Sequence, residues 1–187
     1  IGIIDDVTKT VTMDFKSAGN LIYCIGTTFD ELGGSVYLDT FGLLGRDVPK
    51  VNTRKGGKTF AALSQAVRAG LVRSLHDCSE GGIAAALAEM AFSGGWGATV
   101  YLDEIAYKGK EKRNDIVLFS ESNSRLIVEI DPKNQKKFEK LLKGVAFGLI
   151  GCVGEKPEFV AYGFDREACI RASTSDLKEA WQKPLRW

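Results

Sequence analysis

Apolar residues recur along this chain with two different spacings, and each spacing predicts a different kind of element. Short runs rich in β-branched and aromatic residues predict strands, because the side chains of a strand alternate between two faces. Such runs occupy residues 2–7, 11–15, 20–26, 71–75, 98–102, 125–130, 146–153 and 159–162. The last two are expected to pair with each other around a turn.

Helical spacing, with apolar residues three and four positions apart, is found in four segments. They are residues 58–69, 82–92 and 132–143, and a last short segment that carries Leu177 and Trp181 after a cap at Ser173 or Thr174. Strands and helices do not alternate strictly along the chain, which favours an α+β fold over a doubly wound one. The sequence therefore predicts one domain over residues 1–187, in which helices flank a mixed, mostly antiparallel sheet.

Composition narrows the class of protein. Among the 187 residues, 25 lysines and arginines balance 24 aspartates and glutamates, so the net charge is +1. A nearly neutral chain offers no strong field for nucleic acid or an anionic membrane, and neither is expected as a partner. No apolar run reaches the roughly 20 residues that a membrane-spanning helix needs. The chain opens on Ile1 without an initiator methionine, and it is expected to be a fragment of a longer chain.

The four cysteines lie far apart and form no Cys-x-x-Cys pair, so their spacing excludes zinc-ribbon and thioredoxin-like sites. Cys24 and Cys152 each lie in an apolar run, and both are expected to be small core residues of strands. Unpaired thiols of this kind fit a reducing compartment. The expected localisation is therefore the cytoplasm.

A first candidate site directly follows a predicted strand. His76 and Asp77 come first, Ser79 follows, and Gly81 and Gly82 open the next helix. Carboxylates suit Mg²⁺ and helix N-termini suit phosphates, so Asp77 is a candidate metal ligand and Ser79 a candidate phosphate donor. The alternative is that Asp77 or Ser79 caps the helix and the glycines serve tight packing. His76, the only histidine, is either a general acid or base or a structural hydrogen-bonding residue.

A second candidate site is the polar stretch 118–125, at the entrance of a predicted strand. Its hydroxyl, amide and carboxylate groups come from Ser120, Glu121, Ser122, Asn123 and Ser124. Such a set suits a polar ligand, for example a ribose or an amide, and the alternative is a turn explained by local backbone bonding. Residues 33–35 give a weaker signal of a phosphate-binding loop, because they lack the lysine of a P-loop. The basic residues 54–58 are expected to form an exposed loop.

Several of these segments occur together in a characteristic order. They are VTMDFK (11–16), ELGGSVY (31–37), HDCSEGG (76–82), AEMAF (88–92) and LFSES (118–122). In this order they resemble phosphoribosylformylglycinamidine synthase, the amidotransferase of the fourth step of purine biosynthesis. The resemblance is to the last domain of the small, separate-subunit form, and it runs from Ile1 to about Trp181.

The resemblance implies a domain like the C-terminal domain of aminoimidazole ribonucleotide synthetase, within an enzyme built as a fused dimer of two related halves. It implies an ATP-dependent carbon–nitrogen ligase that converts formylglycinamide ribonucleotide and ammonia to formylglycinamidine ribonucleotide, with Mg²⁺ and ATP as cofactors. The implied partners are formylglycinamide ribonucleotide, the missing N-terminal domains of the same chain, a glutaminase subunit and a small accessory subunit.

The resemblance also assigns roles to single residues. Asp77 matches an aspartate that binds the Mg²⁺ of the nucleotide held in a second, auxiliary site of large-form members, and Ser79 matches a serine of the same turn that contacts this nucleotide. Glu121, Ser122 and Asn123 are the counterpart of a Glu-Ser-Gln triplet that contacts substrate in the first half of the enzyme. Asn123 is one methylene shorter than glutamine, and the pocket of the second half need not be active. The catalytic residues are expected in the missing domains, so the chain alone is expected to be inactive.

Two alternatives stay open. The first is an interaction lobe that packs against its mate and docks the partner subunits, with Asp77 and Glu121 retained but without a function. The second is a relative with the same architecture and another substrate, such as aminoimidazole ribonucleotide synthetase or selenide water dikinase. The segment 31–35 and the turn at His76 favour the synthase over both relatives.

Overall fold

Over most of the chain, the strands and helices lie where the spacing of apolar residues predicts them. The computed structural model describes residues 3–4 and 6–186. The strands are β1 (Leu21–Ile25), β2 (Val72–Asp77), β3 (Gly97–Tyr101), β4 (Leu126–Ile130), β5 (Phe147–Gly154), β6 (Glu158–Tyr162) and β7 (Ala168–Ser173). The α-helices are α1 (Val36–Asp39), α2 (Thr53–Arg68), α3 (Gly82–Gly94), α4 (Asn114–Phe119), α5 (Gln135–Leu141) and α6 (Thr174–Gln182). Short 3₁₀ helices occupy Val7–Lys9, Leu102–Glu104, Pro132–Asn134 and Lys183–Leu185.

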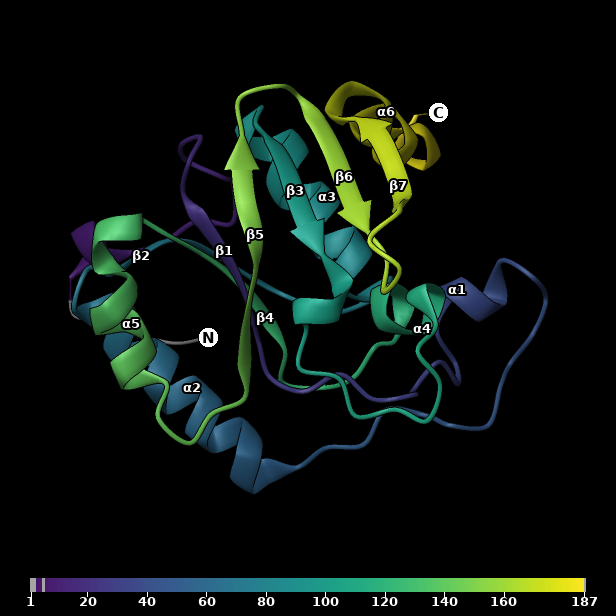
Figure 1. Ribbon diagram of the computed structural model, residues 1–187, viewed down its shortest axis with the longest axis horizontal. Coiled ribbons are helices and arrows are strands. Elements are labelled where there is room, and N and C mark those ends of the chain that lie inside the picture. The colour runs from purple at the N-terminus through teal and green to yellow at the C-terminus, as the bar shows by residue number, and fades with distance from the viewer. Residues whose placement is uncertain (1–2, 5, 187) are drawn as a thin grey trace.

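The seven strands form one sheet in the order β2-β4-β1-β5-β3-β6-β7. Every neighbouring pair is antiparallel except β3 and β6, which run parallel. Figure 1 shows α2 and α5 together on one side of the sheet and α3 on the other. The predicted fold class, a mostly antiparallel sheet flanked by helices, is confirmed.

The centre of the sheet is buried on both faces, which explains why the sequence of β1 is a continuous apolar run. Ile22 and Cys24 face the core that α3 covers, whereas Tyr23 and Ile25 face the core that α2 and α5 cover. The ring of Tyr23 packs edge-on against Phe138 of α5, with 5.2 Å between the ring centroids. The sheet therefore separates two hydrophobic cores, and β1 contributes to both.

The strand predictions need correction at several places. Of residues 2–7, Gly2 and Asp5 lie outside the described residues, and Val7 begins a 3₁₀ helix rather than a strand. The last two predicted strands do form, as β5 and β6, but they are not paired with each other because β3 lies between them. Strand β7 was not predicted. Its residues lie at the sheet edge and are largely exposed, so they carry no alternating apolar pattern.

Residues 11–15, predicted to be a strand, form an irregular segment instead. The main-chain N–H groups of Lys16 and Ser17 donate to the Glu129 carboxylate at 3.0 and 3.2 Å. Glu129 lies in β4 and is fully buried, and the ring of Phe15 enters the core beside α3. A buried carboxylate needs hydrogen-bond donors. The segment itself makes single main-chain bonds, from the N–H of Leu75 in β2 to the carbonyl of Thr12 and from the N–H of Phe15 to the carbonyl of Met90 in α3, so it is held irregularly and forms no strand ladder.

The helix predictions are confirmed in position, and α2 begins earlier than expected. Residues 54–58, expected to be an exposed loop, belong to its first turns, and Asn52 Oδ1 accepts the N–H of Lys55 at 3.0 Å. At the start of α6, Ser173 Oγ accepts the N–H of Asp176 at 3.1 Å, so the cap is Ser173. Side-chain caps of this kind satisfy N–H groups that a helix leaves free at its first turn.

The cysteines divide into two classes. Cys24 is buried in β1 as predicted, whereas Cys152 is exposed, which contradicts the prediction. The reason is the alternation along β5, because Val153 faces the core beside α3 and Cys152 points to the opposite face. Cys78 is also buried and Cys169 is exposed.

These classes predict the reactivity of the thiols. In the folded chain, Cys152 and Cys169 should react rapidly with Ellman's reagent, whereas Cys24 and Cys78 should react only after unfolding. Burial raises the pKa of Cys24 to about 11 and that of Cys78 further, which suppresses the reactive thiolate. Counting the thiols that react with and without concentrated guanidinium chloride tests this prediction. Four equally fast thiols in the folded chain would contradict it.

Candidate functional site

The two polar segments that the sequence singles out meet at one end of the β2–β4 pair. Asp77 ends β2 and is paired with Leu126 at the start of β4. Beyond them, the N–H of Cys78 donates to the carbonyl of Arg125 at 3.0 Å. Because the strands are antiparallel, the residues after β2 lie beside the residues before β4. A cavity of about 400 Å³ opens there, lined by Pro49, Phe60, Asp77, Cys78, Ser79, Glu80, Glu121, Asn123, Ser124, Arg125 and Leu126.

Asp77 presents an exposed carboxylate at this cavity, with 69% of its side chain accessible. Ser79 Oγ donates to Asp77 Oδ2 at 2.6 Å, and Nδ1 of His76 lies 3.3 Å from Oδ1. The hydrogen bond from Ser79 is the main cause that lowers the pKa of Asp77 below its ordinary value. The carboxylate is therefore ionised at neutral pH, as a ligand for a hard cation must be.

His76 is engaged through both ring nitrogens. Besides its contact with Asp77, Nε2 lies 2.7 Å from Oε2 of Glu89 in α3. The other oxygen of Glu89 accepts the indole N–H of Trp181 in α6 at 3.0 Å. Of the two roles considered for His76, this geometry favours the structural one, because the imidazole bridges β2 to α3.

Glu121 links the starts of two helices. Its Oε1 accepts the N–H of Gly81, before α3, and the N–H of Val36, at the start of α1, each at 3.0 Å. The alternative that Asp77 or Ser79 caps α3 is wrong, since the N-cap residue is Gly81 and no side-chain cap bond is formed there. Gly82 is needed for this approach: a Cβ there would lie 2.5 Å from the Ser120 carbonyl oxygen, and its φ is +64°.

The other two members of the triplet point in different directions. Ser122 is fully buried, and its hydroxyl accepts the N–H of Phe29 at 3.1 Å, so it fixes a neighbouring loop and does not line the cavity. Asn123 is exposed and lines the cavity.

Arg125, which sequence reasoning missed, is only 1% exposed and donates to the Ser122 carbonyl at 2.8 Å and to Thr28 Oγ1 at 3.0 Å. An arginine before an apolar strand gave no signal of burial.

The chain is similar to a known protein family over most of its length. Residues 17–163 match the family model described as AIR synthase related protein, C-terminal domain. The chain belongs to this family. Phosphoribosylformylglycinamidine synthase subunit PurL of Alkaliphilus metalliredigens is 35% identical over 189 residues, and that of Moorella thermoacetica is 37% identical over 188 residues. Each alignment covers 99% of this chain, but the AIR synthase related domain spans only about a quarter of these relatives, 24% and 25%.

Solved structures share the fold of this AIR synthase related domain. Thermotoga maritima PurL complexed with FGAR matches with a TM-score of 0.81 and 19% identity over 91% of this chain and 30% of that chain. The hydrogenase maturation protein HypE of Escherichia coli matches with a TM-score of 0.62 and 16% identity over 88% of this chain and 51% of that chain. Identities this low show a common architecture alone and say nothing about a common ligand.

The site of the AIR synthase related domain fits Mg²⁺ by its donor chemistry. Asp77 offers an ionised carboxylate, and Glu80 lies exposed along the same cavity. Among the described residues, no group of three or more His, Cys, Asp or Glu side chains is placed to hold a metal. Mg²⁺ commonly takes one or two carboxylates and completes its shell with water and phosphate oxygens, so the donor set suits a metal shared with a nucleotide.

Residues 33–35 of the domain, which gave a weak signal of a phosphate-binding loop, have a structural role instead. Ser35 is buried, and its Oγ accepts the N–H of Leu38 as the cap of the short helix α1. The N–H of Gly33 donates to the carbonyl of Asp47 at 2.8 Å. These groups are therefore already bonded within the loop. In the part of the chain that the structure describes, no helix is both long and apolar enough to cross a membrane.

Proposed function

We propose that this chain is the C-terminal domain of a phosphoribosylformylglycinamidine synthase, one domain of a longer synthetase subunit. The intact enzyme would convert formylglycinamide ribonucleotide, ATP and ammonia to formylglycinamidine ribonucleotide, ADP and phosphate in purine biosynthesis. The observation that carries the proposal is the meeting of HDCSEGG and LFSES at one cavity, in a chain that aligns over 99% of its length with two PurL subunits. ATP is supported further by a PurL structure complexed with ATP that shares the fold.

The proposal gives each candidate residue a task. Asp77 binds the Mg²⁺ of a nucleotide, and Ser79 contacts the nucleotide. Asn123 lines the cavity and contacts the ligand, while Glu121 and Ser122 hold the surrounding loops in place through their bonds to main-chain N–H groups. When bound, Mg²⁺ would neutralise phosphate charge. The chain itself contributes positioning and charge, and the catalytic residues lie in the other domains.

The proposal extends to partners and compartment. The partners are formylglycinamide ribonucleotide, the N-terminal domains of the same chain, a glutaminase subunit that delivers ammonia, and a small accessory subunit. The compartment is the cytoplasm. Support comes from the PurL relatives, since a domain that spans a quarter of such a subunit needs the remaining domains for a complete site.

Replacing Asp77 in the intact synthetase tests the proposal. With ammonium, Mg-ATP and formylglycinamide ribonucleotide as substrates, Asp77→Asn should lower turnover about 100-fold, the size of effect seen when one group that stabilises charge is removed. It should also weaken Mg²⁺-dependent nucleotide binding, measured by calorimetry. The melting temperature should stay close to that of the wild type, because the Asp77 side chain is mostly exposed.

The matched control is Asp176→Asn, which removes an exposed carboxylate at the start of α6. It should change neither turnover nor binding. Absence of synthase activity in the wild-type enzyme would overturn the family-based function. Unchanged turnover and nucleotide binding in Asp77→Asn would overturn the role of this cavity.

One observation favours the interaction lobe as a second candidate. The segment 40–51 exposes several large apolar side chains that no core covers. They are Phe41, Leu43, Leu44, Val48 and Val51, each more than half exposed. Exposed apolar clusters commonly mark interfaces. If Asp77→Asn lowered the melting temperature but left turnover unchanged, this second function would be the better description.

A further inference from the structure

The imidazole of His76 connects Asp77 at the cavity to side chains of α3 and α6. Its Nδ1 lies 3.3 Å from Oδ1 of Asp77, and its Nε2 lies 2.7 Å from Oε2 of Glu89 in α3. The other oxygen of Glu89, Oε1, accepts the indole N–H of Trp181 in α6 at 3.0 Å. Trp181, Glu89 and His76 therefore form a side-chain network that begins in α6 and ends at the Asp77 carboxylate.

Glu89 fixes the orientation of the imidazole. It is the one charged residue of α3, and both of its oxygens are bonded to side chains, Oε2 to His76 and Oε1 to Trp181. A carboxylate accepts hydrogen bonds and donates none, so Nε2 of His76 carries the proton of their bond. The ring of Trp181 packs against Phe92 with 5.8 Å between the centroids, which holds the far end of the network. The imidazole is thus oriented before any ligand binds.

The Asp77 carboxylate needs such a neighbour, because most of its surface faces solvent. Among the described residues, its other side-chain partner is Ser79, whose Oγ donates to Oδ2 at 2.6 Å. A hydroxyl has one proton to donate, so a Ser79 that turns to a nucleotide phosphate releases Asp77. His76 then remains to orient the carboxylate. A ligand group held in its binding orientation loses less conformational freedom on binding than a free one does.

We infer that His76 is a positioning residue for Asp77: the network through Glu89 and Trp181 holds the imidazole, and the imidazole holds the carboxylate ready for the Mg²⁺ of a bound nucleotide. The inference rests on the proposed function, in which Asp77 binds this Mg²⁺. His76 does not itself line the cavity, so it acts through Asp77 alone. Groups that orient a metal ligand commonly contribute about 10- to 100-fold to metal affinity.

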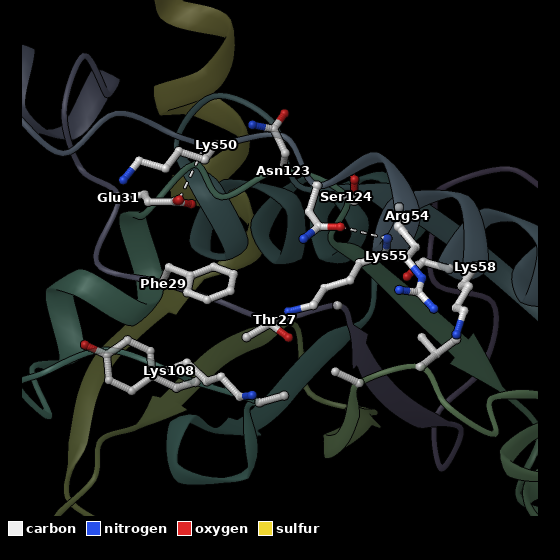
Figure 2. Close-up of a pocket in the computed structure, with 18 of the residues that line it drawn as sticks. Thr27, Phe29, Glu31, Lys50, Arg54, Lys55, Lys58, Lys108, Asn123 and Ser124 are labelled. Carbon is white, nitrogen blue, oxygen red and sulfur yellow. Dashed lines mark hydrogen bonds between the residues drawn. The ribbon is translucent and has the colours of Figure 1, made fainter.

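A neighbouring cavity makes a comparison with and without Mg²⁺ necessary. Its volume is about 560 Å³, and the loop residues Asn123 and Ser124 line both cavities. Figure 2 shows Arg54, Lys55 and Lys58 along its lining. Cationic side chains attract phosphate groups without a metal, so a nucleotide bound there needs no Mg²⁺. The ratio of nucleotide affinity in Mg²⁺ to that in EDTA, the Mg²⁺ gain, is therefore the quantity that reports on Asp77.

Calorimetric titration of the intact synthetase with ADP, in Mg²⁺ and again in EDTA, tests the inference on His76→Gln. The glutamine NH₂ can still donate to Glu89, which preserves the link to α3, but no group remains to face Asp77. The Mg²⁺ gain should fall roughly tenfold, while affinity in EDTA and the melting temperature stay close to the wild type. An unchanged gain would overturn the inference. Equal losses in Mg²⁺ and in EDTA, with a lower melting temperature, would show a merely structural His76 and would also overturn it.

Trp181→Phe tests the far end of the network without touching His76. Phenylalanine keeps an aromatic ring against Phe92 and removes only the N–H that Glu89 accepts. The Mg²⁺ gain should fall roughly threefold, a smaller effect because the change acts through two further side chains. Trp96→Phe is the matched control: Trp96 is also partly buried but lies outside the network, and its replacement should leave the gain unchanged. Equal effects of the two variants would overturn the extension of the network to α6.

Asp77→Asn separates failure of this inference from failure of the proposed function. The proposed function expects Asp77→Asn to lose most of the Mg²⁺ gain. If Asp77→Asn loses the gain and His76→Gln retains it, the proposed site stands and only the positioning role of His76 is overturned. If Asp77→Asn retains the gain, the metal lies elsewhere, and the proposed site and the positioning role are overturned together.

Discussion

Arg125→Met should destabilise the folded chain by about 3–5 kcal/mol. The guanidinium is buried and donates to the carbonyls of Ser120 and Ser122 and to Thr28 Oγ1. Methionine fills a similar volume but leaves these acceptors without a donor, at about 1–3 kcal/mol each. Relief from burying a charge offsets part of this cost. Urea denaturation monitored by circular dichroism measures the difference.

The control for this prediction is Arg171→Met in β7. Arg171 is exposed and its guanidinium pairs with Glu158 on the surface at 2.7 Å. Exposed ion pairs contribute about 0–1 kcal/mol, so this variant should unfold close to the wild type. Equal losses in the two variants would show that burial of Arg125 has no special effect.

Glu129→Met should cost a further large amount, about 4 kcal/mol. The fully buried carboxylate accepts from the N–H groups of Lys16 and Ser17, from Asn20 Nδ2 at 2.7 Å and from Ser74 Oγ at 2.6 Å. Methionine would orphan all of these donors inside the fold. Thermal and urea unfolding of the same samples measure the loss.

Glu129→Gln separates hydrogen bonding from volume. Its amide oxygen keeps the position of Oε1, which accepts from Lys16, Ser17 and Asn20, and its NH₂ donates to Ser74 Oγ, whose hydroxyl can rotate to accept, so the lost bond is that from the Lys16 N–H to Oε2. The expected loss is only about 1 kcal/mol. Glu155→Gln, at an exposed position, should be neutral. A loss for Glu129→Gln as large as that for Glu129→Met would mean that the charge itself is required.

Glu129 also illustrates which parts of the fold the sequence predicts and which it does not. The apolar run around Tyr23 predicted β1, and the spacing of Ile83, Leu87 and Met90 predicted α3, because these elements bury their own local pattern. The irregular segment 11–15 was mistaken for a strand because its conformation is set by single bonds to β2 and α3 and by the Glu129 carboxylate just beyond it, all distant in sequence. No local pattern encodes a bond of that kind.

The candidate site was predicted in part for the same reason. The proximity of Asp77 to the loop of Asn123 follows from strand register, which a single sequence does not state, but both segments were visible through their polar residues. The two bonds from Glu121 to the main chain at the starts of α1 and α3 were not visible, since a bond from a distant loop leaves no spacing signal. The basic residues 54–58 were assigned to a loop, with the helix beginning only at Lys58, because their glycines masked the start of α2.

The order of strands has a consequence for how the site comes into being during folding. Among the described strands, β2 pairs with β4 alone, which is synthesised after α3 and β3, and β4 must also pair with β1. Such non-local pairings form slowly, because long loops must close before any contact is gained. The cavity at Asp77 therefore does not exist in a partly folded chain. A ligand that binds there selects molecules whose sheet is already complete, and it would slow their unfolding without speeding their folding.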